Sequence, residues 1–472
     1  MNQSIGADSP FGGRRAGNLQ RADLWDVAFV IGVGILVLAA AFIGYRLEST
    51  GEPINAGAPP LQGLWDFRLG VGTALAPLIA VVVVTYGVSW VRRARWAALW
   101  PMTWVLTAAW GLAVAWIDPW SRGITEPLLS RYDYLVAVPR VDDLGAFFEA
   151  FTRSVPIDSA TAWPTHVAGH PPVALLPFVL LDRVGLGGPG PAATLIVVLG
   201  ASVSVALLVA TRALVDLDAA RRLAPFGMLA PGVIWSVVSA DALFAAVVGW
   251  AVALTALACT TTGRRADIAA VCGGLAIGLS MYLSYGMVLA LGIGAAVLLS
   301  RGRWRTLLLV VLGVFVVVLV VTLSGFSWLD GYSVVVDRYY DGLGGVRPYS
   351  YWVWANLAAF SLAIGPAAIV GARRAGAAVV ASTRGSPGWP SARATLRSPV
   401  GSTALVTASA LACVVAATLG GLSSGEVERI WLPFGAWVLF AAIAIPRNRT
   451  RLWLSAQAIV VIVLAHIALT PW

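Results

Sequence analysis

The residues best suited to chemistry lie together in the segment Ser130–Pro172, between long apolar runs. This segment contains Asp133, Asp142, Asp143, Glu149 and Asp158, and two of the chain's three histidines, His166 and His170. Carboxylates and imidazoles are the side chains that most often move protons during catalysis. The segment is therefore the candidate site of acid–base chemistry.

Asp133 is the first candidate for a general base. It stands in Arg131-Tyr132-Asp133-Tyr134, shortly after an apolar run. Aromatic neighbours at a membrane surface would partly desolvate the carboxylate and keep it basic enough to accept a proton from a hydroxyl group. Tyr132 is a candidate substrate contact beside it. The alternative is a surface acid paired with Arg131 or Arg122.

Asp142 and Asp143 are the rival carboxylates. Adjacent residues on a helix diverge by about 100°, so both cannot face one site. The sequence VDDLGAFFEAF also predicts that one of them caps a short amphipathic helix whose apolar side chains are buried in the membrane interface. The catalytic and capping roles both stay open for this pair.

His166 and His170 lie four residues apart in THVAGHPP. A regular helix would place both imidazoles on one face, but Gly169 and Pro171 disfavour a regular turn around His170. The absence of an HExxH motif gives a zinc site little support. We expect a rigid corner that presents an imidazole to a polar substrate. A capping or core histidine is the alternative for each.

Arg429 is the main candidate for binding a phosphate. It stands in GEVERIWLPF at the start of an apolar run, where a guanidinium can bind two phosphate oxygens while a lipid tail enters the helix bundle. Glu426 and Glu428 are candidate substrate contacts. The alternative is an interfacial anchor in which one of these glutamates pairs with Arg429.

The polar segment 324–351 offers further candidates of the same kind. Arg338 and Arg347 are predicted phosphate ligands, and Tyr339 and Tyr340 are predicted substrate contacts. Guanidinium and phenol groups are typical of sites that bind sugars or phosphates. Each signal is weak when taken alone.

The composition places these residues in a membrane protein. Hydrophobic residues make up 59% of the 472 positions, charged residues only 12%, and mean hydropathy is +0.82. Soluble domains carry about 25% charged residues. The net charge of +9 is explained by arginines in short loops, which follow the positive-inside rule and require no nucleic-acid partner. The cysteines, Cys259, Cys272 and Cys413, lack metal or CxxC spacing.

The apolar runs predict an all-α bundle of about thirteen transmembrane helices. Arginine-rich loops alternate with acidic loops when the N-terminus is inside, which places segments 118–191, 324–351 and 420–430 outside. This alternation requires PPVALLPFVLLDRVG to lie in the outer interface without crossing. The predicted spans cover residues 24–45, 69–91, 97–117, 192–212, 223–239, 241–261, 267–283, 285–300, 306–323, 352–372, 401–419, 431–446 and 452–470.

The spans also divide the chain. Residues 1–23 are predicted to be a disordered cytoplasmic tail, residues 24–96 a separate transmembrane hairpin, and residues 97–470 a catalytic membrane domain. Within that domain, residues 118–191 form the outer catalytic loop. The stretch 373–398 is rich in Gly, Ser, Pro and Arg and is predicted to be a flexible cytoplasmic linker.

Taken together, these features resemble the GT-C superfamily of membrane glycosyltransferases. The likeness rests on an aspartate in an outer loop after an early span, a His-Pro-Pro element with a surface helix, and spans that meet at Ser239-Ala240-Asp241. The segments HVAGHPPVALLPFVLLDRVGLGGP and GEVERIWLPF are most similar to GT-C-type integral membrane proteins of actinobacteria. The resemblance covers residues 97–470.

The resemblance implies a polyprenyl-phosphate-linked sugar as donor, with mannose or arabinose the expected sugar, and a glycan, glycolipid or protein as acceptor outside the plasma membrane. It implies that Asp133 is the general base, although the Asp-Glu pair common in the family is absent because Tyr134 follows. Arg429, Arg347 and Arg338 would neutralise the leaving phosphate. No cofactor is required, but a divalent cation could bind the outer acids.

Two other functions stay open from the sequence. A transporter or flippase for a lipid-linked or polar solute would need charged residues at mid-membrane depth, and the predicted spans carry almost none. A non-catalytic scaffold that binds polyprenyl lipids would keep the fold without the chemistry.

Overall fold

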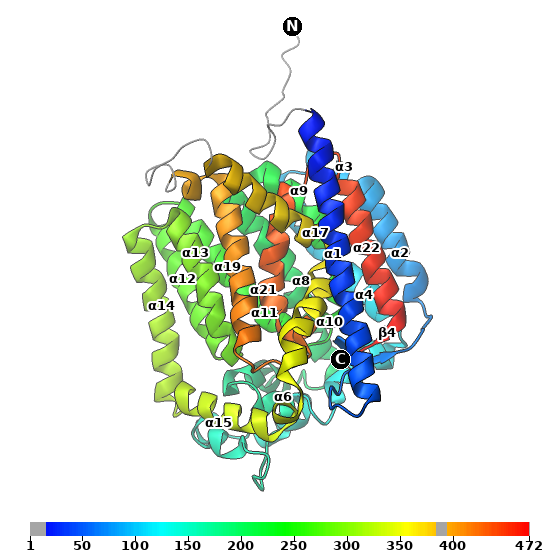
Figure 1. Ribbon diagram of the computed structural model, residues 1–472. Helices are drawn as coiled ribbons and strands as arrows, with labels where there is room; N and C mark the ends of the chain where they lie inside the picture. The colour runs from blue at the N-terminus through cyan, green and yellow to red at the C-terminus, as the bar shows by residue number, and fades with distance from the viewer. Residues whose placement is uncertain (1–15, 384–393, 472) are drawn as a thin grey trace.

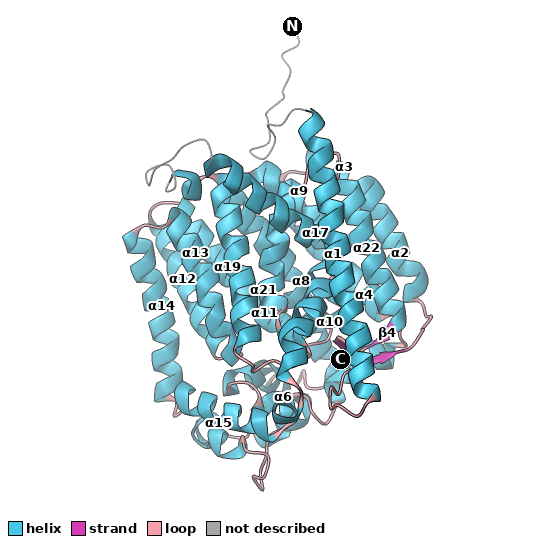
Figure 2. Cartoon of the chain, viewed as in Figure 1, coloured by secondary structure: helices cyan, strands magenta, loops and turns pink. Residues whose placement is uncertain are grey.

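The computed structural model describes residues 16–383 and 394–471 and is a bundle of helices with four very short strands (Figures 1 and 2). The all-α prediction is confirmed. Nine helices among these residues are long and apolar enough to cross a membrane. They are Arg21–Ser49, Gly72–Arg93, Trp96–Ala115, Pro189–Leu214, Asp241–Thr260, Trp304–Leu323, Tyr349–Thr383, Pro399–Leu419 and Thr450–Ile467.

The other four predicted spans correspond to helices that are shorter or less apolar. Residues 223–239 form the end of α9 and the short α10, residues 267–283 lie in α12, and residues 285–300 and 431–446 form the two shorter apolar helices. These helices lie inside the bundle beside longer ones, where a segment need not face lipid along its whole length.

The first half of the chain contains most of the short helices. In chain order its helices are α1 (Ala16–Ser49), α2 (Gly72–Val82), α3 (Val88–Arg93), α4 (Trp96–Ala115), α5 (Leu144–Ala150), α6 (Thr165–Ala168), α7 (Leu176–Arg183), α8 (Pro189–Leu214), α9 (Leu217–Met228) and α10 (Val233–Ser236). A π-helical turn, Val83–Gly87, joins α2 to α3. The strands β1 (Gly57–Ala58), β2 (Leu61–Gln62) and β3 (Leu64–Trp65) follow α1, and β3 pairs with β4 (Ala468–Leu469) in antiparallel register.

The second half consists mainly of long helices that complete the bundle. They are α11 (Asp241–Thr260), α12 (Arg264–Met281), α13 (Leu291–Arg301), α14 (Trp304–Leu323), α15 (Trp328–Asp341), α16 (Leu343–Val346), α17 (Tyr349–Thr383), α19 (Pro399–Leu419), α20 (Val427–Ile430), α21 (Leu432–Leu439) and α22 (Thr450–Ile467). α11 packs between α8 and α12, and α17 packs against α19 and α21. α17 is kinked at Gly365, which has a φ of 73° and stands directly before Pro366.

Residues 118–188 and α15 gather at the end of the bundle opposite the first turns of α1 (Figure 1). The segment after His170 forms α7, which has eight residues. Such a helix is too short to cross a membrane, as the sequence predicts. The exposed Leu180, Val184 and Leu186 suit a position in the membrane interface.

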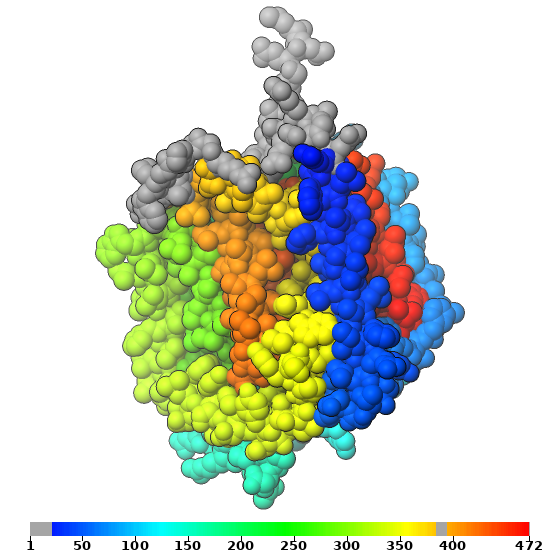
Figure 3. Space-filling model, viewed as in Figure 1, coloured from blue at the N-terminus to red at the C-terminus, as the bar shows by residue number. Residues whose placement is uncertain are grey.

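α1 lies as a ridge along the outside of the bundle, between α17 and α22 (Figure 3). It begins at Ala16, inside the stretch predicted to be a disordered tail, while residues 1–15 fall outside the described residues. Asp26, fully buried in α1, accepts a hydrogen bond of 2.7 Å from Nε of Arg373. α17 continues past Arg373 to Thr383, so the predicted linker at 373–398 is helical over its first part. Residues 384–393 of that linker lie outside the described residues.

The break between α9 and α10 places Asp241 at the start of α11. α9 ends at Met228, before Pro231, and α10 begins at Val233, so carbonyl groups near the break have no helical partners. Backbone groups at membrane depth need hydrogen bonds from within the protein. Nε2 of Gln457 donates to the carbonyls of Phe226 (3.1 Å) and Leu229 (2.7 Å), so the unwound segment is stable inside the bundle.

Candidate active site

Asp133 and His166 form the first half of the site. Asp133 Oδ2 lies 3.2 Å from His166 Nδ1, and Asp133 Oδ1 accepts a hydrogen bond of 2.6 Å from the backbone N–H of Tyr134. The backbone of His166 is fixed in turn, because its N–H donates to the carbonyl of Tyr132 at 2.9 Å. The Asp133 side chain is 15% exposed. It is therefore held in one orientation and stays open to a substrate on one side.

His170 lies behind this pair in the His-Pro-Pro corner. Its Nδ1 is 2.7 Å from the carbonyl of His166 and 2.8 Å from the hydroxyl of Tyr134. A carbonyl can only accept, so the proton of the neutral ring sits on Nδ1 and leaves a lone pair on Nε2. Burial lowers the pKa of His170, and the ring is neutral at pH 7. These hydrogen bonds hold the ring in the corner, and its role toward a substrate stays a prediction.

Tyr134 supports both histidines. Its ring stacks on Phe178 of α7 at a centroid distance of 5.3 Å and is nearly fully buried. Burial, together with nearby Asp241 and Asp133, raises the pKa of the phenol well above its usual value. The hydroxyl therefore keeps its proton. Tyr134 was not among the predicted site residues, although it follows Asp133 directly in the chain.

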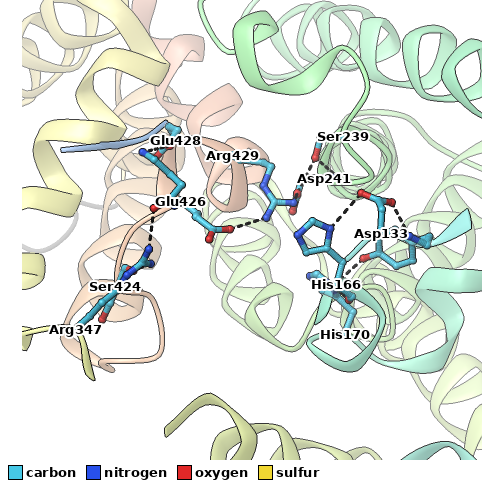
Figure 4. A network of polar contacts seen from close by, with 12 residues as sticks. Asp133, His166, His170, Ser239, Asp241, Arg347, Ser424, Glu426, Glu428 and Arg429 are labelled. Carbon is cyan, nitrogen blue, oxygen red and sulfur yellow. Dashed lines mark hydrogen bonds and ion pairs between the residues drawn. The ribbon is translucent and has the colours of Figure 1, made fainter. Parts of the chain in front are cut away.

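Arg429 and Asp241 form the second half of the site (Figure 4). Arg429 Nη1 donates to Asp241 Oδ2 at 2.9 Å, and Nη2 donates to Glu426 Oε2 at 2.9 Å. Asp241 also accepts a hydrogen bond of 2.8 Å from the Ser239 hydroxyl. Burial alone would lower the pKa of Arg429, but the adjacent carboxylates of Asp241 and Glu426 raise it above its usual value.

The two halves meet at one end of the bundle. The charges of Asp241 and Arg429 both act on the ring of His170, and that of Arg429 acts on Tyr134. Figure 4 shows Arg429 and Asp241 directed toward the two histidines and Asp133. Asp241 could have been found from the sequence, because it is an acidic residue at the start of an apolar span. It was named only as part of the resemblance to the GT-C superfamily and was not predicted to be a site residue. Its pairing with Arg429 brings together segments that are distant in the chain.

Asp142 and Asp143 lie outside this arrangement. Asp143 Oδ1 accepts a hydrogen bond of 2.7 Å from the backbone N–H of Ala146 and caps α5, whose Phe147 and Phe148 are buried. The capping role is therefore confirmed for Asp143. Both aspartates are exposed. Asp143 caps a helix and Asp142 faces solvent, so the structure does not support the catalytic role predicted for them.

The side chains of Arg338 and Arg347 donate hydrogen bonds to groups of the protein itself. Arg338 donates to the carbonyls of Val155 and, at 3.2 Å, Trp163, and so joins α15 to the outer loop. Arg347 is 6% exposed and donates to the carbonyl groups of two separate loops. The phosphate roles of both arginines stay predictions, and their guanidinium nitrogens are already used to join segments of the protein.

The predicted contacts Tyr132, Tyr339, Tyr340 and Glu428 surround the site without entering the Asp133–Arg429 arrangement. Tyr132 and Tyr340 are about half exposed. Tyr339 packs edge-on against Tyr340 at 5.3 Å. Glu428 is fully buried and accepts a hydrogen bond of 3.3 Å from the backbone N–H of Gln62. Among the predicted substrate contacts, Glu426 binds Arg429 through its side chain.

An apolar cavity lies between the helices and is partly open to the surface of the bundle. Its walls come from α4, α8, α9, α10, α11, α17 and α21, and include Gly111, Gly200, Ala242, Phe360 and Leu432. Ala242, which follows Asp241 in the chain, lines this cavity, although the Asp241 side chain itself does not. The apolar lining suits a hydrocarbon chain.

No three histidine, cysteine or acidic side chains within residues 16–383 and 394–471 are grouped so as to hold a metal ion. The acids of the site are instead engaged in pairs, Asp133 with His166 and Asp241 with Arg429. A divalent cation on the outer acids therefore stays a prediction, with no set of ligands assigned to it.

Comparison with known proteins identifies the fold. No family model and no curated protein sequence matches the chain. Among solved structures, the oligosaccharyltransferase of Archaeoglobus fulgidus, in complex with zinc and sulfate, is similar with a TM-score of 0.50 at 14% identity, over 78% of this chain. The chain has a GT-C-type fold. The similar region is 54% of the neighbour, so the chain spans about half of that protein's length.

Proposed function

We propose that this chain is a glycosyltransferase that moves a sugar from a polyprenyl-phosphate donor to a hydroxyl group of an acceptor at the outer face of the plasma membrane. One observation carries the proposal: a held carboxylate, Asp133, and a buried guanidinium, Arg429, face the same site (Figure 4), and Ala242, next to the Arg429 partner Asp241, lines an apolar cavity. This is the combination of groups that a donor with a sugar, a phosphate and a lipid chain requires. The GT-C-type fold supports the same class of reaction.

In the proposed reaction, Asp133 takes the proton of the acceptor hydroxyl as its oxygen attacks the anomeric carbon. The bond between that carbon and the phosphate oxygen breaks, and its electron pair goes to the phosphate. The leaving group thereby gains negative charge, which Arg429 stabilises. His166 holds Asp133 in place, and His170, with a lone pair on Nε2, orients a hydroxyl group.

Glu426 enters this scheme as a competitor of the donor phosphate. Asp241 and Glu426 each hold one end of the Arg429 guanidinium, and together they more than offset its charge. Asp241 is buried, whereas the Glu426 side chain is 23% exposed. The phosphate would therefore displace Glu426 from Nη2, while Asp241 keeps Arg429 in place.

The experiment is transfer by the full chain reconstituted in liposomes. Farnesyl phosphate esters of mannose and of arabinose serve as donors, with alkyl glycosides and serine- or threonine-containing peptides as acceptors. We expect glycosylated acceptor and free farnesyl phosphate in equal amounts, with no chelator sensitivity. Donor binding without transfer would replace the proposal by the scaffold, and movement of intact donor across the bilayer would replace it by the transporter.

A further inference from the structure

The loop that carries Arg429 is irregular and depends on support from outside itself. Gly421 and Gly425 have φ values of 71° and 90°, and Glu426, which is not a glycine, has a φ of 61°. A non-glycine residue persists in this left-handed region only where the surrounding structure holds it there. The contacts made by residues 420–430 therefore decide where the guanidinium of Arg429 lies.

Asn356 of α17 binds this loop at the Ser423 carbonyl and the Gly425 N–H, and Arg347 is the side chain that connects it to another loop. Its Nη1 donates to the carbonyl of Ser424, two residues before Glu426. Its Nη2 donates to the carbonyl of Asn55 at 2.7 Å and to Oε1 of Gln62 at 2.8 Å. The guanidinium also lies 5.4 Å from the ring centroid of Trp352. A single buried side chain thus joins the Arg429 loop to the loop between α1 and α2.

Gln62 provides a second connection between the same two loops. Its backbone N–H donates to Oε1 of Glu428 at 3.3 Å, and its side-chain carbonyl oxygen accepts from Arg347. Glu428 is fully buried and precedes Arg429 directly. Figure 4 shows Arg347 with Ser424, and Arg429 with Glu426, on the same side of the site.

We propose that the loop of residues 51–65 is a working part of the site, in which Gln62 and Arg347 are positioning residues that hold Arg429 where the donor phosphate binds. The role of Arg429 rests on the proposed function, but the connection itself does not. Bidentate binding of phosphate by a guanidinium has strict geometry, and a displacement of about 1 Å costs on the order of a hundredfold in rate. The N-terminal hairpin, which the sequence suggests is separate from the catalytic domain, is on this view required for the chemistry.

The test uses the full chain in detergent and two measurements on each variant. Hydrogen–deuterium exchange of residues 420–430 reports on the loop, and the dissociation constant of farnesyl phosphate reports on the phosphate site. The variants are Arg347→Lys, which cannot reach three acceptors, and Gln62→Ala, a smaller change that keeps the backbone contact to Glu428. Gln62→Glu keeps an acceptor for Arg347. Arg221→Lys is the matched control, because Arg221 donates twice to the carbonyl of Ala94 at the other end of the bundle.

We expect Arg347→Lys and Gln62→Ala to speed exchange in residues 420–430 at least tenfold and to weaken farnesyl phosphate binding about tenfold. Gln62→Glu and Arg221→Lys should stay within about twofold of the wild type in both. Unchanged exchange in Arg347→Lys and Gln62→Ala would overturn the proposal. If the wild type itself fails to bind farnesyl phosphate, the proposed function fails, and the exchange rates alone still decide whether the loop is held in this way.

Discussion

Arg429 and Asp241 form a buried ion pair with a distance of 2.9 Å between Nη1 and Oδ2, although 188 positions separate them in the chain. Their side chains are 6% and 4% exposed. Neither charge would be stable alone in such surroundings, because the desolvation of an unpaired ion is not compensated. The pair therefore fixes the 420–430 loop against the start of α11, and this contact assembles the site.

Asp133→Asn should abolish sugar transfer, with a loss of about 10²–10⁴-fold, because it removes the proton acceptor at nearly constant shape. Asp143→Asn is the matched control. Asparagine caps a helix as well as aspartate does, so this variant should transfer sugar at nearly the wild-type rate. The measurement is initial rate in liposomes at equal amounts of folded protein. A larger loss in Asp143→Asn than in Asp133→Asn would make Asp143 the base.

The Arg429–Asp241 pair allows stability and chemistry to be separated. Arg429→Met leaves a buried carboxylate without its partner and should lower the free energy of unfolding by about 3–5 kcal/mol. The double variant Arg429→Met/Asp241→Leu removes both charges and should regain most of that loss, seen as a recovered melting temperature. Transfer should stay absent in the double variant. Restored transfer would show that Arg429 has no role in the reaction.

Glu426→Gln should tighten donor binding several-fold, since the phosphate would no longer compete with a carboxylate for Nη2 of Arg429. The measurement is the KM for the farnesyl phosphate sugar, with the kcat recorded alongside. A higher KM would instead mean that Glu426 binds the substrate, as the sequence suggests.

Glu428 should make stability depend on pH. Burial raises its pKa from 4.5 to about 7, so the folded protein holds this proton more tightly than the unfolded chain. This difference in proton affinity contributes roughly 3 kcal/mol to the free energy of unfolding. The contribution is fully present below pH 4.5 and is lost as the pH rises through 7. Glu428→Gln, which keeps a neutral side chain, should remove this decline in melting temperature. Glu149→Gln, at an exposed glutamate, should leave the decline unchanged.

The apolar cavity should bind the lipid chain of the donor. Ala108 lines it from α4, and Ala108→Phe would fill part of the space. We expect a KM at least tenfold higher for long-chain donors and a smaller effect for farnesyl donors. Val105 lies one turn earlier on the same helix and is 59% exposed, so Val105→Phe should change neither value. Equal effects of the two substitutions would place the lipid chain elsewhere.

The sequence alone predicted the parts of the site whose residues lie close together in the chain. Asp133, His166 and His170 belong to one segment between α4 and α8, and their contacts span fewer than about forty residues. The Asp143 cap and the non-crossing segment at α7 were also predicted, because capping and helix length depend on neighbours in the chain. The carbonyl contacts of Arg338 and Arg347 were not predicted, because a guanidinium can donate to a carbonyl group as well as to a phosphate.

The sequence by itself determined that this is a helical membrane protein with its acids and histidines gathered in one loop, because hydropathy and charge act along the chain. Only the tertiary structure decided that Asp241 joins Arg429, that Gln62 and Arg347 connect the Arg429 loop to the loop after α1, and that an apolar cavity lies between the helices. These contacts join segments tens to hundreds of residues apart. Their formation depends on how whole helices pack, and no local pattern of residues specifies which buried charge meets which partner.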